Sequence, residues 1–233
     1  MRVFHFGDPV APLRDLLARG GVVAFPTESS YALGVDPWNQ TGVEAIYRIK
    51  EREAGKALPV VIAGRAQLAG LGIDENLRFF KGDPNIVERF FAVWPAPLTV
   101  VLPVARPLPA SAGEGTLAVR VPAHAELLAL LAALGHGLTA TSANRSGEAP
   151  ILDPAALGAL LAGEDAAVVD GGVLRGGLPS TLVALSAEGA IEGEGLVVLR
   201  EGRFPAERLT RDLGRSTARG EAPPARPTGE DEA

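Results

Sequence analysis

Short apolar runs of strand length recur along the chain and alternate with segments whose apolar residues repeat with the period of a helix. The strand-like runs lie at residues 22–25, 59–62, 98–102, 117–121, 167–169, 181–183 and 196–199. The helical patterns lie at residues 10–19, 42–51, 84–93, 125–134, 154–161 and 206–213. This alternation predicts an α/β fold in which helices pack on a sheet.

Several predicted helices begin at residues that favour a helix start. The Asp-Pro pairs at 83–84 and 153–154 each place a capping carboxylate before a proline at the first helical position, where its missing N–H has no helical partner. Residues 41–44, Thr-Gly-Val-Glu, have the spacing of a capping box. We therefore predict that helices begin at these three points and that the helix starting at Thr41 ends near Arg52.

Length and composition favour one domain. The chain has 233 residues, of which 47% are hydrophobic, and this is ample for a substantial core. No internal repeat or long linker divides it. From residue 214 onward the sequence is rich in Pro, Gly and charge and has almost no large apolar residue. We expect a single domain over residues 1–213 and a disordered polar tail over 214–233.

Charge and cysteine content narrow the function classes. The absence of cysteine excludes disulfides, thiolate metal sites and a cysteine nucleophile. The net charge of -6 disfavours broad electrostatic binding of nucleic acid phosphates. The N-terminus lacks the apolar run of a secretory signal, and no segment reaches the roughly 20 apolar residues that span a bilayer. We expect a soluble, cytoplasmic protein in which any cationic site is local.

The first candidate site follows the strand at 22–25. Val43 and Ile46 lie on one helical stripe that Lys50 continues, and Arg52 and Lys56 come just after the predicted helix end, where the helix dipole favours cations. The hydroxyl-rich segment 25–31 precedes this helix. These groups suit a polyphosphate. The alternatives are a cationic helix end with solvated side chains, which composition alone favours, and local hydrogen bonding within the turn.

The second candidate site lies at residues 139–147, which form a run of small hydrogen-bonding residues. Ser142 and Asn144 are two apart on extended chain, so their side chains face the same way and could meet one ligand. A satisfied turn is the alternative when this motif stands alone. The chain has no phosphate-binding loop of Walker type, no H-E-x-x-H motif and no G-x-S-x-G elbow, and its three histidines lack convincing catalytic partners. His124 in particular is expected to cap a helix or to lie on the surface.

Six short sequence motifs occur in a consistent order, and together they resemble a known family, which neither candidate site does alone. They are FPTESSYALG at 25–34, Lys50-x-Arg52 with Lys56, WPAPLTVVLP at 94–103, LAVRVPAH at 117–124, TSANRSG at 141–147 and PSTLVAL at 179–185. Together they closely resemble the YrdC-like family of threonylcarbamoyl-AMP synthases, in its short bacterial single-domain form.

The resemblance implies a twisted mixed sheet flanked by helices, with a concave cationic cleft. It also implies a nucleotidyltransferase that converts L-threonine, bicarbonate and ATP into threonylcarbamoyl-adenylate and pyrophosphate, with magnesium as the cofactor. The product would serve tRNA modification through downstream tRNA threonylcarbamoyl transferase proteins. Weak tRNA binding is compatible with this reading, and membrane contact is not expected.

The family's functional residues map onto this sequence by position. Lys50 and Arg52 would be catalytic. The implied ATP-binding residues are Arg52, Lys56, Thr116, Ser142, Asn144 and Arg200. The implied threonine-binding residues are Ser29, Arg120 and Ser180. No metal ligand is assigned. Ala96, Ala184 and Ser29 depart from the family's usual residues, which affects details of the substrate contacts.

Two other functions compete with this reading. An RNA-binding module could use the same cleft, although the acidic charge balance argues against it. A related carbamoyl-adenylate activity occurs in the YrdC-like domain of hydrogenase-maturation carbamoyltransferases, but those chains carry zinc-binding and transferase regions that this sequence lacks. The synthase is therefore the preferred interpretation.

Overall fold

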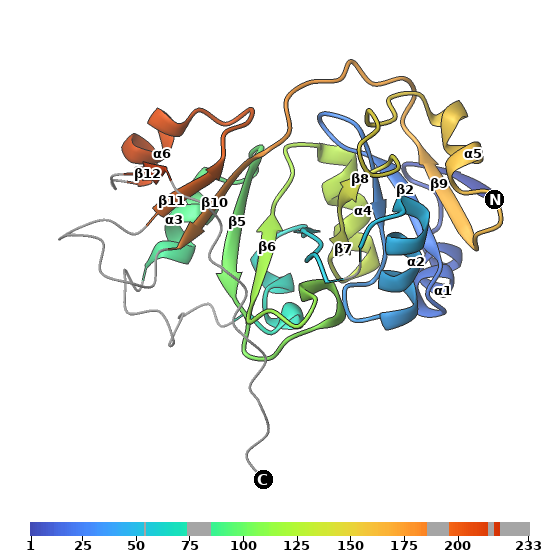
Figure 1. The fold of residues 1–233 in the computed structure, drawn as a ribbon, viewed down its shortest axis with the longest axis horizontal. Helices are drawn as coiled ribbons and strands as arrows, with labels where there is room; N and C mark the ends of the chain where they lie inside the picture. Colours follow the sequence, from blue (N-terminus) through green and yellow to red (C-terminus); the bar gives the residue numbers. More distant parts are fainter. Residues whose placement is uncertain (54, 74–84, 186–195, 214–216, 220–233) are drawn as a thin grey trace, which may run out of the picture.

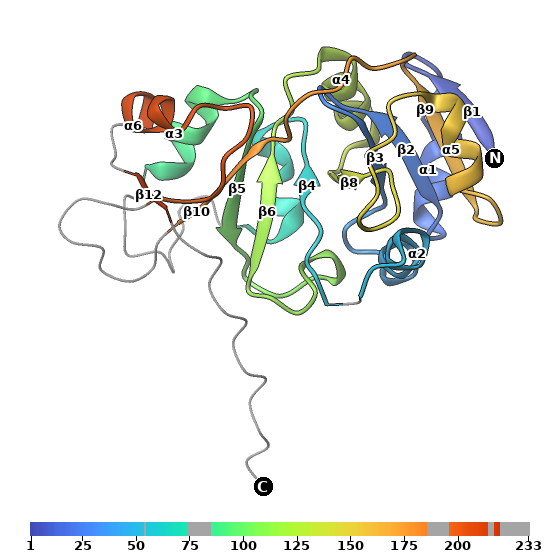
Figure 2. The same ribbon diagram turned by 45° about the horizontal axis from the view of Figure 1, so that its top comes forward.

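The computed structural model describes residues 1–53, 55–73, 85–185, 196–213 and 217–219, and its strands form two mixed sheets side by side (Figure 1, Figure 2). The five-stranded sheet has the order β1 (Arg2–His5), β9 (Ala166–Asp170), β2 (Val22–Pro26), β3 (Tyr31–Gly34) and β8 (Thr141–Ser142). The seven-stranded sheet has the order β12 (Thr217–Arg219), β11 (Leu196–Arg200), β10 (Thr181–Leu185), β5 (Leu98–Pro103), β6 (Thr116–Arg120), β4 (Val60–Val61) and β7 (Leu138–Thr139). The predicted α/β fold with mixed strand pairing is confirmed, with the strands divided between two sheets.

Helices pack on both sheets. The α-helices are α1 (Ala11–Ala18), α2 (Gln40–Lys50), α3 (Ile86–Val93), α4 (Ala125–Leu134), α5 (Leu157–Leu160) and α6 (Ala206–Leu213). The 3-10 helices are η1 (Arg65–Gln67), η2 (Ala69–Leu71), η3 (Pro109–Ser111) and η4 (Pro154–Ala156). Leu131 of α4 belongs to one apolar cluster with Phe25 of β2 and Leu138 of β7, so this helix packs against both sheets. The segment 171–180 crosses from β9 to β10 and also joins the two sheets (Figure 1).

Strand β2 is buried on both faces, which explains its continuous apolar sequence. Val22 and Ala24 belong to the larger apolar cluster, whereas Val23 and Phe25 belong to the cluster that α1 and α4 cover. Its parallel pairing with β9 places it in the interior of the five-stranded sheet. The polar segment that follows β2 is therefore fixed to a rigid element at its start.

Helix α2 begins two residues earlier than its sequence predicts. Asn39 is the N-cap, and its Oδ1 accepts a hydrogen bond of 3.0 Å from the Gly42 N–H, so the helix starts at Gln40. The prediction of Thr41 as the cap is wrong, because Asn39 lies earlier in the chain and satisfies the same exposed N–H groups. The helix ends at Lys50, since Glu51 has left-handed backbone angles.

The other predicted helix starts fare differently. Asp153 caps the chain as expected, with its Oδ1 accepting from the Ala155 N–H at 2.9 Å, although the first turn is the 3-10 helix η4. His124 is the N-cap of α4, and its Nδ1 accepts from the Leu127 N–H at 3.3 Å, as predicted. The Asp-Pro pair at 83–84 lies outside the described residues.

The C-terminal segment is described in only one place beyond residue 213. Thr217–Arg219 form β12, which pairs in parallel with β11. The remainder of the predicted tail lies outside the described residues, so its disorder stays a prediction. Among the described helices, none has the length and apolar content needed to cross a membrane.

Candidate active site

The two candidate sites of the sequence meet at Lys50. This last residue of α2 is only 3% exposed, and its ammonium donates hydrogen bonds to three oxygens of the 142–144 segment. The acceptors are the Ser142 carbonyl at 2.5 Å, the Asn144 carbonyl at 3.0 Å and Asn144 Oδ1 at 2.9 Å. An ammonium has three N–H donors, so these contacts use all of them. Lys50 therefore fixes the Ser142–Asn144 segment to the end of α2.

The electrostatic setting of Lys50 differs from that of a surface lysine. Burial and the nearby Arg52 guanidinium lower the pKa of Lys50 to about 8. The alternative of a solvated cation is wrong for this residue. It fits Lys56, which is exposed and lies 3.4 Å from a carboxylate oxygen of Glu53. Arg52 is half-buried, and no hydrogen bond or ion pair joins its guanidinium to another residue within the described ranges.

Further hydrogen bonds and strand pairing also hold the Ser142–Asn144 segment in place. The Ser142 hydroxyl donates to Asn144 Oδ1 at 2.5 Å, which confirms that the two side chains face the same way. The Asn144 amide donates to the carbonyls of Arg145 and Glu148, both at 2.8 Å. Ser142 also lies opposite Ala32 in the β8–β3 pairing. This packing holds a pair of small polar side chains next to the hydroxyl-rich turn between β2 and β3.

Two hydroxyl groups of that turn have close hydrogen-bond partners. The Thr27 hydroxyl donates to the Ser30 carbonyl at 2.7 Å, and both residues are buried. The Tyr31 hydroxyl donates to the Gly172 carbonyl at 2.9 Å and accepts from the Gly171 N–H at 3.1 Å. The alternative of local hydrogen bonding within the turn is therefore correct for Thr27, whereas Tyr31 bonds to a segment 140 positions away in the chain. Ser29 is half-buried, with its hydroxyl 3.5 Å from that of Thr27.

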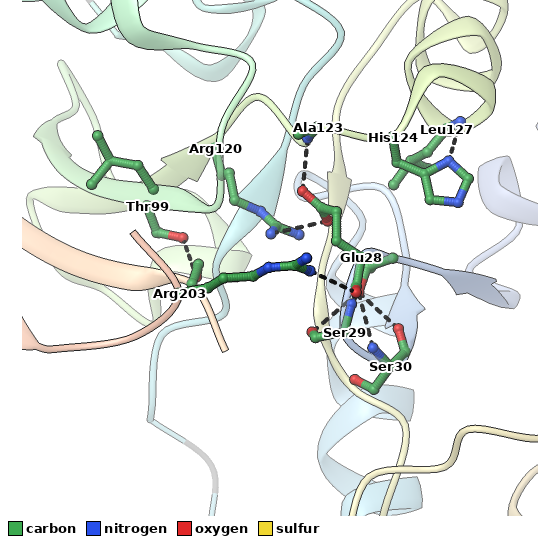
Figure 3. A network of polar contacts seen from close by, with 12 residues as sticks. Glu28, Ser29, Ser30, Thr99, Arg120, Ala123, His124, Leu127 and Arg203 are labelled. Carbon is green, nitrogen blue, oxygen red and sulfur yellow. Dashed lines mark hydrogen bonds and ion pairs between the residues drawn. The ribbon is translucent and has the colours of Figure 1, made fainter. Parts of the chain in front are cut away.

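Glu28 of the same turn connects the two sheets (Figure 3). One carboxylate oxygen accepts from the Ala123 N–H at 2.7 Å, and the other lies 3.2 Å from Arg120 Nη1 at the end of β6. Burial lowers the pKa of the Arg120 guanidinium; Glu28 opposes that shift, and nearby Arg200 adds to it. The Glu28 carbonyl also accepts from Arg203 Nη1 at 3.2 Å. Arginines from two parts of the chain thus gather around one acid.

Ser180 lies beside this group at the start of β10. Its hydroxyl is 2.7 Å from the hydroxyl of Thr99, and its carbonyl accepts from Arg200 Nη2 at 2.9 Å. Burial lowers the pKa of Arg200 as well. Arg120, Ser180 and Arg200 are thus near one another, as the predicted site requires.

Thr116, like Lys56, is a predicted site residue that these contacts do not reach. It is exposed at the first position of β6, whereas Arg120 is the last, about 13 Å away at the usual rise of a strand. No interaction among the described residues joins Thr116 to the other predicted site residues. Its place in the ATP site stays a prediction.

A family model described as telomere recombination, Sua5/YciO/YrdC, matches residues 15–202. The chain belongs to this family. Among the relatives of this Sua5/YciO/YrdC member is a threonylcarbamoyl-AMP synthase of Thiobacillus denitrificans, 40% identical over 178 residues, which are 75% of this chain and 89% of that protein. Another, from Alkalilimnicola ehrlichii and of the same name, is 37% identical over 66% of this chain and 77% of its own length.

Solved structures agree with the family assignment. The crystal structure of P. abyssi Sua5 complexed with L-threonine has a TM-score of 0.76 and 29% identity, and the similarity covers 94% of this chain. The chain spans only 62% of that Sua5 chain. E. coli YciO has a TM-score of 0.65 and 25% identity, with 86% of this chain and 94% of YciO covered. The Sua5/YciO fold is thus shared along most of the present chain.

Sequence reasoning missed two residues of this family member's site. Glu28 was visible as the single acid within FPTESSY, and an acid among small hydroxyls is the available signal. Arg203 follows β11 in a segment with no motif. Nothing in its local sequence indicates that it reaches the turn after β2, because that contact joins residues 175 positions apart.

Proposed function

We propose that this protein is a nucleotidyltransferase that makes threonylcarbamoyl-adenylate and pyrophosphate from L-threonine, bicarbonate and ATP. The observation that carries this proposal is 40% identity across 89% of a protein named threonylcarbamoyl-AMP synthase. The joining of the α2 end to the Ser142–Asn144 segment supports it, because a fixed loop with small polar groups beside cations suits a nucleotide. The acidic balance does not favour the RNA-binding alternative.

On the nucleotide side, Arg52 is the proposed catalytic cation. Its guanidinium has no partner among the described residues and can turn toward the phosphates, with Lys56 as a second, exposed cation. Lys50 acts through the loop that it holds, since its three donors already have acceptors. The other proposed ATP-binding residues are Thr116, Ser142, Asn144 and Arg200.

On the amino acid side, Arg120 is proposed to bind the carboxylate of L-threonine, with Ser29 and Ser180 as hydroxyl partners. Arg120 is 9% exposed, so its charge acts in surroundings of low polarity, where an ionic hydrogen bond is strong. A threonine complex is known for P. abyssi Sua5, which shares 29% of its aligned residues with this chain.

The proposed reaction needs no protein nucleophile. Bicarbonate takes up a proton and loses water to give carbon dioxide, and the threonine amine adds to the carbon dioxide and loses a proton, which forms a carbamate. A carbamate oxygen then attacks the α-phosphorus of ATP, while the bond from that phosphorus to the bridging oxygen breaks and pyrophosphate leaves. The protein's part is to place the two reactants in line and to stabilise charge on the phosphoryl oxygens.

Magnesium is proposed to enter with ATP. Within the part of the chain that the structure describes, no group of three or more His, Cys, Asp or Glu side chains could hold a metal ion. Phosphate oxygens and water are therefore its expected ligands, as is usual for nucleotide-bound magnesium. When bound, the ion would neutralise charge on the phosphates.

The deciding experiment measures pyrophosphate release by the purified full chain with ATP, magnesium and bicarbonate. L-threonine is compared with L-serine and with no amino acid, and the product is identified by mass. Threonine-dependent release with threonylcarbamoyl-adenylate supports the proposal. Folded protein that releases no pyrophosphate contradicts it, and tRNA binding would then test the RNA-binding alternative. Supply of this adenylate to downstream tRNA threonylcarbamoyl transferase proteins in the cytoplasm completes the proposal.

A further inference from the structure

Glu28 forms an ion pair that is unusually well buried for a residue in a turn. The side chains of Glu28 and Arg120 are each 11% exposed. Glu28 Oε2 is buried and makes no well-oriented hydrogen bond, and the Arg120 guanidinium is the cation that lies against this oxygen. A buried carboxylate that lost this partner would be strongly disfavoured. The pair therefore fixes the direction of the guanidinium as well as that of the acid.

Most N–H donors of the Arg120 guanidinium have no protein partner among the described residues. A guanidinium has five N–H donors in a planar fork. Glu28 faces Nη1, and no other hydrogen bond or ion pair joins this guanidinium to a residue in the described part of the chain. The remaining donors suit the two oxygens of a carboxylate, which bind such a fork side by side. Because Glu28 is held at Ala123 too, the available edge has a set orientation.

The turn that carries Glu28 is held from outside by Arg203. This exposed residue donates from Nη1 to the Glu28 carbonyl at 3.2 Å, and its backbone N–H donates to the Pro179 carbonyl at 2.8 Å. Pro179 directly precedes Ser180. Arg203 thus links the turn after β2 to the start of β10 across the two sheets (Figure 3). Arg120, Arg200 and Arg203 outnumber the single acid Glu28, so the group keeps an excess of positive charge for an anionic ligand.

We propose that Glu28 is a positioning residue that orients Arg120 toward the carboxylate of an α-amino acid, with Arg203 holding the Glu28 turn in place. This inference rests on the proposed function. It goes beyond that function by assigning recognition of the substrate's carboxylate in part to an acid that does not touch the substrate. An analogue whose carboxylate is an amide, L-threoninamide, should therefore bind poorly.

The test measures L-threonine affinity by calorimetry and, separately, the KM values for L-threonine and ATP in the pyrophosphate assay. Glu28→Gln keeps the length of the side chain and an acceptor for the Ala123 N–H but removes the charge. We expect its dissociation constant and KM for L-threonine to rise about tenfold or more, in line with loss of a charge-assisted contact. Its KM for ATP should change less than about threefold. Glu28→Asp, which keeps the charge, should recover part of the loss.

A matched control is Glu164→Gln. Glu164 forms an ion pair with Arg48 at 2.7 Å on the surface, so its loss should leave both KM values unchanged. If Glu28→Gln does not fold, Arg203→Ala tests the same idea, because Arg203 is exposed and its removal leaves the buried pair in place. It should weaken L-threonine binding more than ATP binding.

The outcomes separate the two proposals. A wild-type protein that binds L-threonine but releases no pyrophosphate contradicts the synthase function, while a weaker threonine affinity of Glu28→Gln would still support the positioning role. An active wild type whose Glu28→Gln variant melts at a lower temperature but keeps its threonine KM overturns the positioning role and leaves only a structural one. Equal binding of L-threoninamide and L-threonine by the wild type also overturns it.

Discussion

Replacing Lys50 with methionine tests whether this lysine holds the Ser142–Asn144 segment. Methionine has nearly the same length but no donor, so the substitution removes three hydrogen bonds without creating a large cavity. Asn144 Oδ1 still accepts from the Ser142 hydroxyl. The carbonyls of Ser142 and Asn144 lose the lysine as a donor.

The expected loss of stability follows from these two carbonyls. A buried acceptor left without a partner costs about 1–3 kcal/mol, which gives a loss of about 2–6 kcal/mol for the pair. Removing a buried charge offsets part of this. We therefore expect the free energy of unfolding of Lys50→Met to fall by about 2–4 kcal/mol, and the melting temperature by about 5–15 °C for a chain of this size. The rate of threonine-dependent pyrophosphate release should fall at least about 100-fold, as for the loss of a preorganised polar site.

Thermal unfolding followed by circular dichroism and the pyrophosphate assay would measure both effects. The matched control is Lys56→Met, in which an exposed lysine is removed from the same chain region. Its free energy of unfolding should stay within about 0.5 kcal/mol of the wild type, while its KM for ATP rises. A Lys50→Met variant that melts within about 2 °C of the wild type would refute the reasoning, because the three hydrogen bonds would then contribute no net stability.

Three further results are expected. Arg52→Ala should lower pyrophosphate release about 100-fold with an unchanged melting temperature, since this half-buried guanidinium has no partner among the described residues; an unchanged rate would rule out its catalytic role. The affinity for ATP should fall as the pH rises through about 8, the pKa of Lys50, because the neutral amine can no longer serve three acceptors. Between about pH 8 and pH 10.5, the unfolded lysine, with its ordinary pKa of 10.5, binds more protons than the folded one, so the free energy of unfolding linked to this group should rise with pH. If Lys50→Met loses ATP affinity with rising pH as the wild type does, the loss does not come from Lys50. Gly202→Ala should destabilise the protein by about 1–3 kcal/mol and weaken threonine binding, since the added Cβ would lie 2.3 Å from the Pro179 carbonyl oxygen and 2.7 Å from that of Ser180. Gly115→Ala, whose Cβ would meet nothing within 4 Å, is the control, and equal melting temperatures of the two variants would show that the close packing at Gly202 is not essential.

Lys50 shows what the sequence pattern could predict about a residue and what it could not. Its place on the stripe of Val43 and Ile46 correctly predicted a buried lysine at the end of α2. The pattern could not identify its acceptors, because these lie more than 90 residues away and include backbone carbonyls, which every residue has. The start of α2 was misplaced for a different reason. Asn39 and Thr41 are both good caps, and the choice between them depends on backbone angles that a sequence does not state.

Sequence patterns alone indicated the family, the six α-helices and seven of the twelve described strands. Periods of two and 3.6 residues mark strands and helices because they reflect which side chains a strand or a helix turns toward a core. The six motifs, with their order, indicated the Sua5/YciO/YrdC assignment that the family model bears out. Only the tertiary structure divided the strands between two sheets and brought Glu28, Arg120 and Arg203 together across them. Such contacts depend on how sheets pack in space, and charged side chains that meet there carry no periodic signal along the chain.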